Sequence, residues 1–203
     1  THVAGIAAAY GNNGKGIARI AWNSTILAIK NASSTGNITF ANAVASIKKA
    51  ADLGAKVINC SWGYKPTLFN DLMLSIYGLE GAVNYATAKG AIVVCASGNE
   101  GNTEVRYPGR YGNAFCVGST TSSDTRSSFS NYGPQVDIAA PGSSILSTIP
   151  GGGYGTKSGT SMAAPCASGA LAVAWSRFPS YTAAQIRGRL QRTAVELSAL
   201  GLG

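Results

Sequence analysis

Residues 91–96 read AIVVCA, a short apolar run that follows the helical stretch Asp71–Lys89 and the glycine that ends it, Gly90. An apolar run of this length between turn residues is typical of a buried strand. Lys56–Cys60 (KVINC) and Phe115–Ser119 (FCVGS) have the same character. Buried strands separated by helical stretches predict a mostly parallel central sheet that helices cover on both faces, which is a three-layer αβα arrangement.

The rest of the chain continues this alternation. Its segments are a short apolar run at Ser24–Ile29, a helix at Phe40–Asp52 that Gly54 ends, short β-like pieces within Thr120–Gly155, an apolar helix from Ser161 to about Trp175, and an amphipathic helix at Ser180–Ala194. Neither an internal repeat nor a low-complexity linker divides them. The sequence therefore predicts one α/β domain over residues 1–203.

Composition excludes several classes of protein. The 203 residues are 45% hydrophobic and carry a formal net charge of +8. The basic residues are scattered and do not alternate with aromatic residues, so we expect no nucleic-acid binding and interpret the charge as a solvated surface. Because no apolar run has the length of a membrane span and no signal peptide opens the chain, we expect no contact with a membrane. The first residues, THVAGIAAAY, resemble helix interior without a cap, which predicts that the N-terminus is a truncation point.

Four cysteines lie in apolar stretches, without a nearby histidine or a C-x-x-C pair: Cys60, Cys95, Cys116 and Cys166. This setting argues against a zinc site and favours buried free thiols. A disulfide between Cys60 and Cys95, on neighbouring strands, stays open as an alternative.

Residues 159–165, GTSMAAP, place one serine, Ser161, at the start of an apolar helix. A buried serine without a partner carries a desolvation cost, whereas the positive end of a helix favours a nucleophile on which negative charge develops. The motif is not the G-x-S-x-G elbow of α/β-hydrolases, because Ala163 stands at the second glycine and residues 162–203 contain neither Asp nor His. A hydrolase that uses this serine must take its base and acid from residues that precede it.

Six segments, in this order, resemble the subtilisin-like serine proteases (subtilases) over almost the whole chain. They are THVAGIAAAYGNNGKGI, KVINCSWG, VVCASGNEGN, YPGRYGNAFCVGST, SSFSNYGPQVDIAAPGSSILST and GTSMAAPCASGALA. The resemblance implies the subtilisin-like fold and a serine endopeptidase that uses an Asp/His/Ser triad. It makes Ser161 the nucleophile and Asn99 the side-chain donor of the oxyanion hole. Taken alone, an asparagine in a Gly-Asn dipeptide is more often an ordinary turn residue.

The resemblance also identifies catalytic residues that this sequence does not contain. The family's base is the first histidine of His-Gly-Thr-His-Val-Ala-Gly, and this sequence begins at the threonine, so His2 matches the second, structural histidine. The aspartates match no triad position, although Asp137 has a structural counterpart. We therefore expect a domain that lacks its N-terminal strands and its C-terminal end, is nearly inactive alone, and has the missing N-terminal segment as a partner. The alternative is a non-catalytic pseudoprotease that binds peptides or serves as a scaffold.

Substrate-binding residues follow from the same resemblance. One wall of the primary specificity pocket, which also pairs with the substrate backbone, is Ser61, Trp62 and Gly63; the opposite wall is Ala96, Ser97 and Gly98; a second edge is Gly36, Asn37 and Ile38. Trp62 stands where the family often has leucine. Substrate contact and ordinary packing are equal alternatives for its role.

Arg106 falls at the floor of this pocket, just before a Tyr107–Pro108 bond that the resemblance predicts to be cis. A guanidinium that points inward would select acidic or strongly polar side chains and repel basic ones. The alternatives are that Arg106 extends to solvent, or that Glu100 or Glu104 neutralises it. In the latter case Trp62 and Ala96 would select apolar groups.

The loop at 11–17, GNNGKGI, resembles the family's calcium loop. Asn13 would supply a side-chain oxygen, and Gly11, Lys15 and Ile17 backbone carbonyls, to a structural calcium ion. An ordinary Asn-Gly turn is an equal alternative, because Lys15 is basic and the family's carboxylate ligand lies upstream. The resemblance implies catalysis without a cofactor. The resemblance further implies a protein or peptide substrate, a propeptide inhibitor and an extracellular location.

Overall fold

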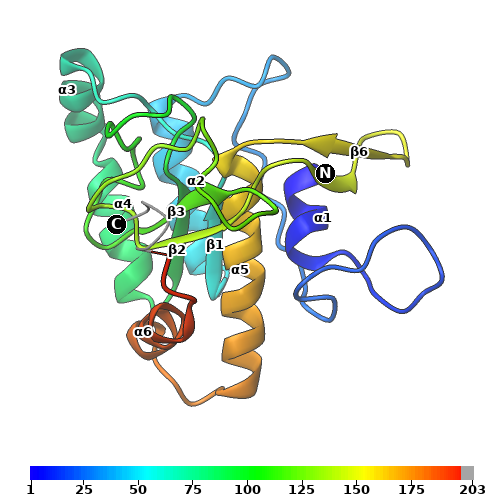
Figure 1. Cartoon of the computed structure of the whole chain (residues 1–203). Coiled ribbons are helices and arrows are strands. Elements are labelled where there is room, and N and C mark those ends of the chain that lie inside the picture. Colours follow the sequence, from blue (N-terminus) through cyan, green and yellow to red (C-terminus); the bar gives the residue numbers. More distant parts are fainter. Residues whose placement is uncertain (198–203) are drawn as a thin grey trace.

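The computed structural model describes residues 1–197, and Figure 1 labels most of its helices and strands. The helices are α1 (His2–Ala8), α2 (Phe40–Asp52), α3 (Leu68–Tyr77), α4 (Leu79–Ala88), α5 (Thr160–Arg177) and α6 (Ala183–Thr193). The strands are β1 (Val57–Cys60), β2 (Ile92–Ala96), β3 (Phe115–Thr120), β4 (Ile138–Pro141), β5 (Ile145–Thr148) and β6 (Tyr154–Lys157).

The centre of the fold is a four-stranded sheet in the order β1-β2-β3-β4. All three neighbouring pairs are parallel, which confirms the prediction from the apolar runs. Strands β5 and β6 form a separate antiparallel hairpin. Because parallel strands run in one direction, the loops that follow β1 and β2 leave the sheet at the same edge.

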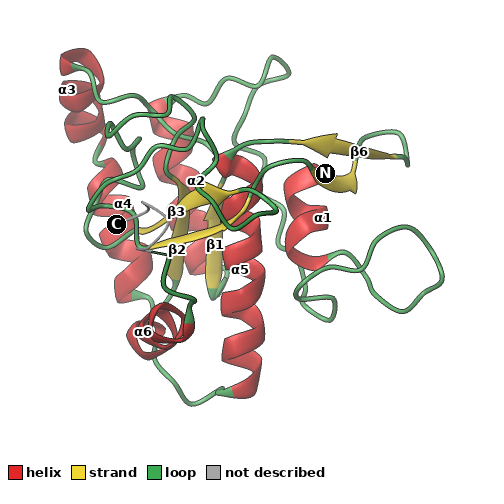
Figure 2. Cartoon of the chain, in the orientation of Figure 1, coloured by secondary structure: helices red, strands yellow, loops and turns green. Residues whose placement is uncertain are grey.

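Helices cover both faces of the sheet, so the fold has the predicted three layers (Figure 2). One core lies under α2 and α4 and contains alternate residues of β1 and β2, such as Ile58 and Val93. The other lies under α5 and α6 and contains the intervening residues of β2, such as Val94, together with residues of β3, such as Val117. A strand that is buried on both faces has no polar positions to alternate with, which explains the continuous apolar runs.

Two segments differ from the prediction. The helical stretch Asp71–Lys89 is two helices, because Gly78 adopts a left-handed conformation (φ 71°) between α3 and α4. An apolar periodicity does not reveal one such residue, since glycine adopts this conformation at little cost. The run Ser24–Ile29 is not a strand, and Ile26 and Leu27 in it are about half exposed. Among the described residues no strand pairs with it, and of its apolar side chains Ile29 packs against the core.

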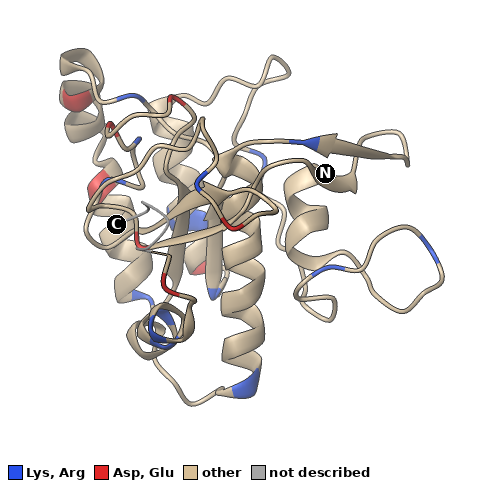
Figure 3. Cartoon of the chain, in the orientation of Figure 1, with Lys and Arg blue, Asp and Glu red and all other residues tan. Residues whose placement is uncertain are grey.

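Within the described residues, none of the helices combines the length and apolarity that a membrane span requires. Figure 3 shows Lys and Arg distributed over helices, strand ends and loops.

Helix α1 packs against the outer side of α5, and glycine makes this approach possible. A Cβ atom on Gly169 of α5 would lie 2.9 Å from the carbonyl oxygen of Ala7 and 2.9 Å from Cβ of Ile20. We expect Gly169→Ala to lower the free energy of unfolding by about 1–3 kcal/mol, because backbone on one side cannot move away cheaply.

The matched control is Gly81→Ala in α4, where an added Cβ would meet nothing within 4 Å. This change should raise the free energy of unfolding by about 0.4–1 kcal/mol, because it restricts the unfolded chain. Urea denaturation of both variants measures the difference. Equal effects of the two substitutions would show that the contact between α1 and α5 is not tight.

Candidate active site

A hollow of about 100 Å³ lies where the loops after β1 and β2 meet the start of α5. We call it the Ser161 hollow, and its lining residues are Trp62, Gly63, Ala96, Gly98, Asn99, Arg106, Thr160 and Ser161. This position, at the carboxyl ends of parallel strands, is where open α/β sheets place their ligands. Seven of the eight residues that line it are among those predicted from the sequence; Thr160 is the addition.

Ser161 is the second residue of α5, after the N-cap Gly159. Its hydroxyl donates to the carbonyl oxygen of Ser61 at 3.0 Å, and the Ser61 hydroxyl donates in return to the carbonyl oxygen of Ser161 at 2.9 Å. These two bonds hold the serine beside the loop that follows β1. The Ser161 hydroxyl is therefore hydrogen-bonded to a backbone carbonyl, which is not a base and does not raise the nucleophilicity of the hydroxyl oxygen.

Asn99 is fixed in one orientation by Thr160. The Thr160 N–H and hydroxyl both donate to Asn99 Oδ1, at 2.8 and 2.9 Å. Thr160 is completely buried, and its hydroxyl also lies within hydrogen-bonding distance of the Gly98 N–H at 3.2 Å. Because Oδ1 is occupied by donors, the amide NH₂ is the free end of this side chain.

Two donors consequently remain unpaired beside the Ser161 hydroxyl. In the described part of the chain no group accepts a hydrogen bond from Asn99 Nδ2 or from the Ser161 N–H. The N–H groups of the first helical turn have no partner within the helix, and the helix dipole favours negative charge there. The arrangement provides two N–H groups for an oxygen that becomes negative next to Ser161 Oγ.

Asn131 supports the segment that carries Asn99. It is 1% exposed, its Oδ1 accepts from the Glu100 N–H at 2.8 Å, and its Nδ2 donates to Glu100 Oε2 at 2.9 Å. Sequence reasoning missed both Asn131 and Thr160. Their value lies in contacts with residues about 30 and 60 positions away along the chain, respectively, which no local motif reveals.

Glu100 and Arg106 form an ion pair at the edge of the hollow. Arg106 Nε donates to Glu100 Oε2 at 3.2 Å, and Arg106 Nη1 donates to the carbonyl oxygen of Gly63 at 3.1 Å. Of the alternatives for Arg106, the structure selects neutralisation by Glu100 and not by Glu104. The Arg106 guanidinium, together with hydrogen bonds from Asn131 and from the Asn99 N–H, lowers the pKa of Glu100 from 4.5 to about 2.

This carboxylate should make stability depend on pH in acid. Between about pH 4.5 and pH 2 the unfolded chain binds a proton at Glu100 that the folded protein does not bind. Its stabilising contribution is complete above this range and is lost as the pH falls through it. We expect the free energy of unfolding to fall more steeply there for the parent than for Glu100→Gln, in urea denaturation at several pH values. Glu104→Gln, at an exposed carboxylate, is the matched control; a parent slope equal to that of Glu100→Gln would contradict the ion pair.

Other predicted residues lie outside the lining of the hollow. Ser97 is buried, and its hydroxyl donates to the carbonyl oxygen of Asn131. Gly36 and Asn37 lie in an exposed turn. The neighbouring Ile38 is tied to the loop after β1, because the Tyr64 hydroxyl donates to its carbonyl oxygen at 3.0 Å. The segment predicted as the second edge is thus attached to the loop that carries the first.

Two further expectations concern single groups. The Tyr107–Pro108 bond is cis, as predicted. His2 is 6% exposed, its Nε2 lies 3.0 Å from the carbonyl oxygen of Gly155, and it is not part of the Ser161 hollow. A buried histidine that binds a backbone carbonyl in the β6 hairpin agrees with a structural role.

All four cysteines are buried free thiols. Cys60 and Cys95 are register partners on β1 and β2, and Cys95 and Cys116 on β2 and β3, yet no disulfide joins them. Burial raises the pKa of Cys95, Cys116 and Cys166, which makes these thiols poor nucleophiles.

The loop at 11–17 does not by itself fit a calcium ion. Asn13 Oδ1 accepts from the Lys15 N–H at 3.0 Å, so the one side-chain oxygen predicted as a ligand has a partner within the turn. The loop contains no carboxylate and includes a lysine. Calcium binds through six to eight oxygen atoms, usually including carboxylates. Among the described residues no group of three or more His, Cys, Asp or Glu side chains is placed to hold a metal ion.

Comparison with known proteins gives this geometry a context. A model described as the subtilase family matches residues 1–203. Thermitase of Thermoactinomyces vulgaris is 46% identical over 99% of this chain and 68% of its own length. An alkaline protease of Alkalihalobacillus alcalophilus is 40% identical over 100% of this chain and 51% of its own length. Subtilisin Savinase of Lederbergia lenta is 39% identical over 100% of this chain and 72% of its own length. The chain thus spans from about half to about three quarters of these relatives.

Solved structures agree with the sequence relatives. A protease from Pseudoalteromonas arctica superposes with a TM-score of 0.88 at 30% identity, over 97% of this chain and 63% of that one. A cold-adapted subtilisin-like serine proteinase superposes with a TM-score of 0.81 at 33% identity, over 97% of this chain and 67% of that one. The parallel sheet, the serine at the start of α5 and these similarities lead to one conclusion: the chain belongs to the subtilase family.

Proposed function

We propose that this chain carries the nucleophile, the oxyanion hole and the primary specificity pocket of a serine endopeptidase. The observation that supports this most directly is the pair of unpaired donors, Asn99 Nδ2 and the Ser161 N–H, beside the Ser161 hydroxyl. In acyl transfer the carbonyl oxygen of the scissile bond becomes negative when Ser161 Oγ attacks the carbonyl carbon. Donors that are already oriented stabilise this charge without reorganisation.

The base and the acid of the triad are proposed to come from a segment that is not among these 203 residues. The sequence contains a single histidine, His2, and it is buried at the β6 hairpin. With a histidine supplied next to Ser161, the hydroxyl would donate its hydrogen bond to that histidine instead of to the carbonyl oxygen of Ser61, and the proton would pass to the histidine during attack and later to the leaving amine. The protein that we call the completed protein is this chain preceded by a segment that has an aspartate at a strand end and finishes with His-Gly before Thr1.

The substrate is proposed to be a protein or peptide that binds in extended form. Residues 61–63 and 36–38 lie in loops that the Tyr64–Ile38 hydrogen bond joins, and an extended peptide can add its backbone to such edges. A propeptide that inhibits the site by the same contacts, and an extracellular location, are part of this proposal. A calcium ion at the loop 11–17 is retained only with a carboxylate contributed from outside these residues, since Asn13 alone does not suffice.

One observation favours a second candidate, a peptide-binding pseudoprotease. Ser161 donates to a backbone carbonyl, and no histidine lines its hollow. Under this candidate the hollow and the edges would bind a peptide without cleaving it.

Hydrolysis of a peptide anilide by the completed protein tests the proposal against this candidate. We expect turnover that Ser161→Ala abolishes. Ser158→Ala is the matched control, because Ser158 is exposed and, within residues 1–197, its hydroxyl only accepts from the Ser144 N–H; it should retain the activity of the parent. Peptide binding without any turnover would support the pseudoprotease instead.

A further inference from the structure

We propose that Arg106 and Glu100 close the floor of the Ser161 hollow, so that the site accepts a small neutral side chain, such as that of alanine, before the scissile bond. This inference rests on the proposed function, since it names the substrate class for the same site. It differs from the two pockets that the sequence suggests. One is an acid-selecting pocket with the Arg106 guanidinium pointing inward, and the other is an apolar pocket lined by Trp62 and Ala96.

Arg106 is bonded to both walls of the hollow and to Glu100. On one side Nη1 donates to the carbonyl oxygen of Gly63 at 3.1 Å. On the other side Nε donates to Glu100 Oε2 at 3.2 Å, and Nη2 completes the ion pair. The backbone of Arg106 is held as well, because its N–H donates to the carbonyl oxygen of Ser97 at 2.9 Å. The side chain is therefore fixed at both ends and cannot leave the floor without breaking several bonds.

Gly63 and Arg106 are in direct contact, which leaves no space between wall and floor. A Cβ atom on Gly63 would lie 3.0 Å from Cβ of Arg106 and 2.7 Å from the carbonyl oxygen of Tyr107. The hollow that remains measures about 100 Å³ and includes the space next to Asn99 and Ser161. An apolar cavity of about 150 Å³ holds one benzene ring. A phenylalanine ring would therefore extend beyond the space that these residues line, whereas a methyl group fits within it.

The ion pair between Arg106 and Glu100, which closes the floor, also weakens selection for charged substrate side chains. Glu100 already neutralises Arg106, and it also accepts from the Asn99 N–H at 3.1 Å and from Asn131. An acidic substrate side chain would have to replace a carboxylate that has four donors. A basic side chain would meet Arg106 and the nearby Lys65, whose Nζ lies 3.8 Å from Glu100 Oε1. A neutral side chain neither displaces Glu100 nor is repelled by Arg106 and Lys65.

The test measures kcat/KM of the completed protein on peptides that differ only before the cut, with Ala, Phe, Glu or Lys. We expect Ala to exceed Phe by about tenfold or more, since a pocket discriminates by roughly 10–200-fold per group that does not fit. Arg106→Ala should raise the Phe-to-Ala ratio by at least about tenfold, because it removes the floor. Glu100→Gln keeps the floor but leaves its charge uncompensated, and should raise cleavage after Glu relative to Ala.

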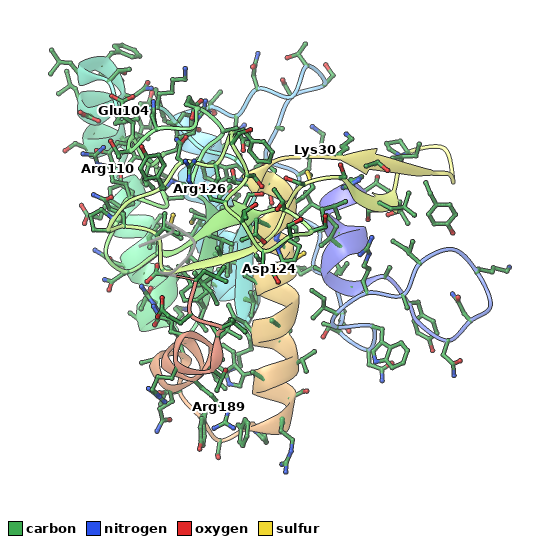
Figure 4. The ribbon with its side chains drawn as sticks, viewed as in Figure 1. Lys30, Glu104, Arg110, Asp124, Arg126 and Arg189 are labelled. Atoms are coloured by element: carbon green, nitrogen blue, oxygen red, sulfur yellow. The ribbon has the colours of Figure 1, made fainter. Side chains whose placement is uncertain are left out.

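Arg110→Ala is the matched control, since Arg110 comes from the same loop between β2 and β3 but does not line the hollow (Figure 4). It should leave all four ratios unchanged. A parent that prefers Phe, or a Phe-to-Ala ratio that Arg106→Ala does not change, would overturn the inference.

If the completed protein cleaves no peptide, the proposed catalysis fails while the pocket can still be tested. The 203-residue chain should then bind peptides that end in alanine more tightly than matched peptides that end in phenylalanine, and Arg106→Ala should reverse this order. Equal affinities would contradict the closed floor without reference to catalysis.

Discussion

The 203-residue chain alone is expected to hydrolyse a peptide anilide about 10⁶-fold more slowly than the completed protein. Two unpaired N–H donors, the proposed oxyanion hole, lie beside Ser161, but its hydroxyl donates to the carbonyl oxygen of Ser61, which cannot accept the proton in the reaction. The expected factor is the known cost of removing a whole triad from a subtilisin, about 2 × 10⁶ in kcat. The residual rate, about 10³–10⁴ above water, would come from the oxyanion hole and binding.

Two variants identify the source of any turnover that the chain alone does show. Activity that Ser161→Ala removes but His2→Ala retains would indicate a base that neither the sequence nor the structure identifies. Activity that His2→Ala removes would contradict the structural role of His2, which the 3.0 Å contact with Gly155 supports. A circular dichroism spectrum of each variant shows whether the fold is kept.

Asn99→Ala in the completed protein should lower kcat by about 10²–10³ and leave KM almost unchanged, which is the known effect of removing this type of donor from a subtilisin. Thr160 orients the amide by two hydrogen bonds to Oδ1. The NH₂ group is therefore free to donate to an oxygen that carries charge only in the transition state, and such a bond contributes to kcat and not to ground-state binding.

Asn113→Ala is the matched control for this substitution, because Asn113 is exposed and bonds only to Asn84 among the described residues. It should leave kcat and KM unchanged. A rise in KM with constant kcat for Asn99→Ala would show that Asn99 binds the ground state, and an unchanged kcat/KM would remove it from the oxyanion hole.

The sequence predicts the layers of this fold well because its strands are buried on both faces. Val94 and Val117 face one core while Ile58 and Val93 face the other, so apolar residues predominate in the runs and distinguish the strands from the turns. The prediction fails where the conformation of a single residue ends a helix, since Gly78 divides one expected helix into α3 and α4.

The candidate site could likewise be predicted only in part. Ser161 and Asn99 follow from the resemblance because they lie in short, continuous motifs, and the structure brings both to one hollow. Thr160 and Asn131 act by hydrogen bonds to distant segments, so their importance becomes visible only in three dimensions. Arg106 had three open alternatives in the sequence, and the choice depends on a contact with Glu100.

Covalent labelling of the completed protein by a fluorophosphonate tests most directly the claim that Ser161 is the nucleophile. Attack by the serine oxygen on phosphorus forms an O–P bond, releases fluoride and passes the hydroxyl proton to the base. Intact mass and peptide mapping should find one adduct, on Ser161, and none in Ser161→Ala. An adduct on another residue, or peptide cleavage that persists while Ser161 stays unlabelled, would contradict the account.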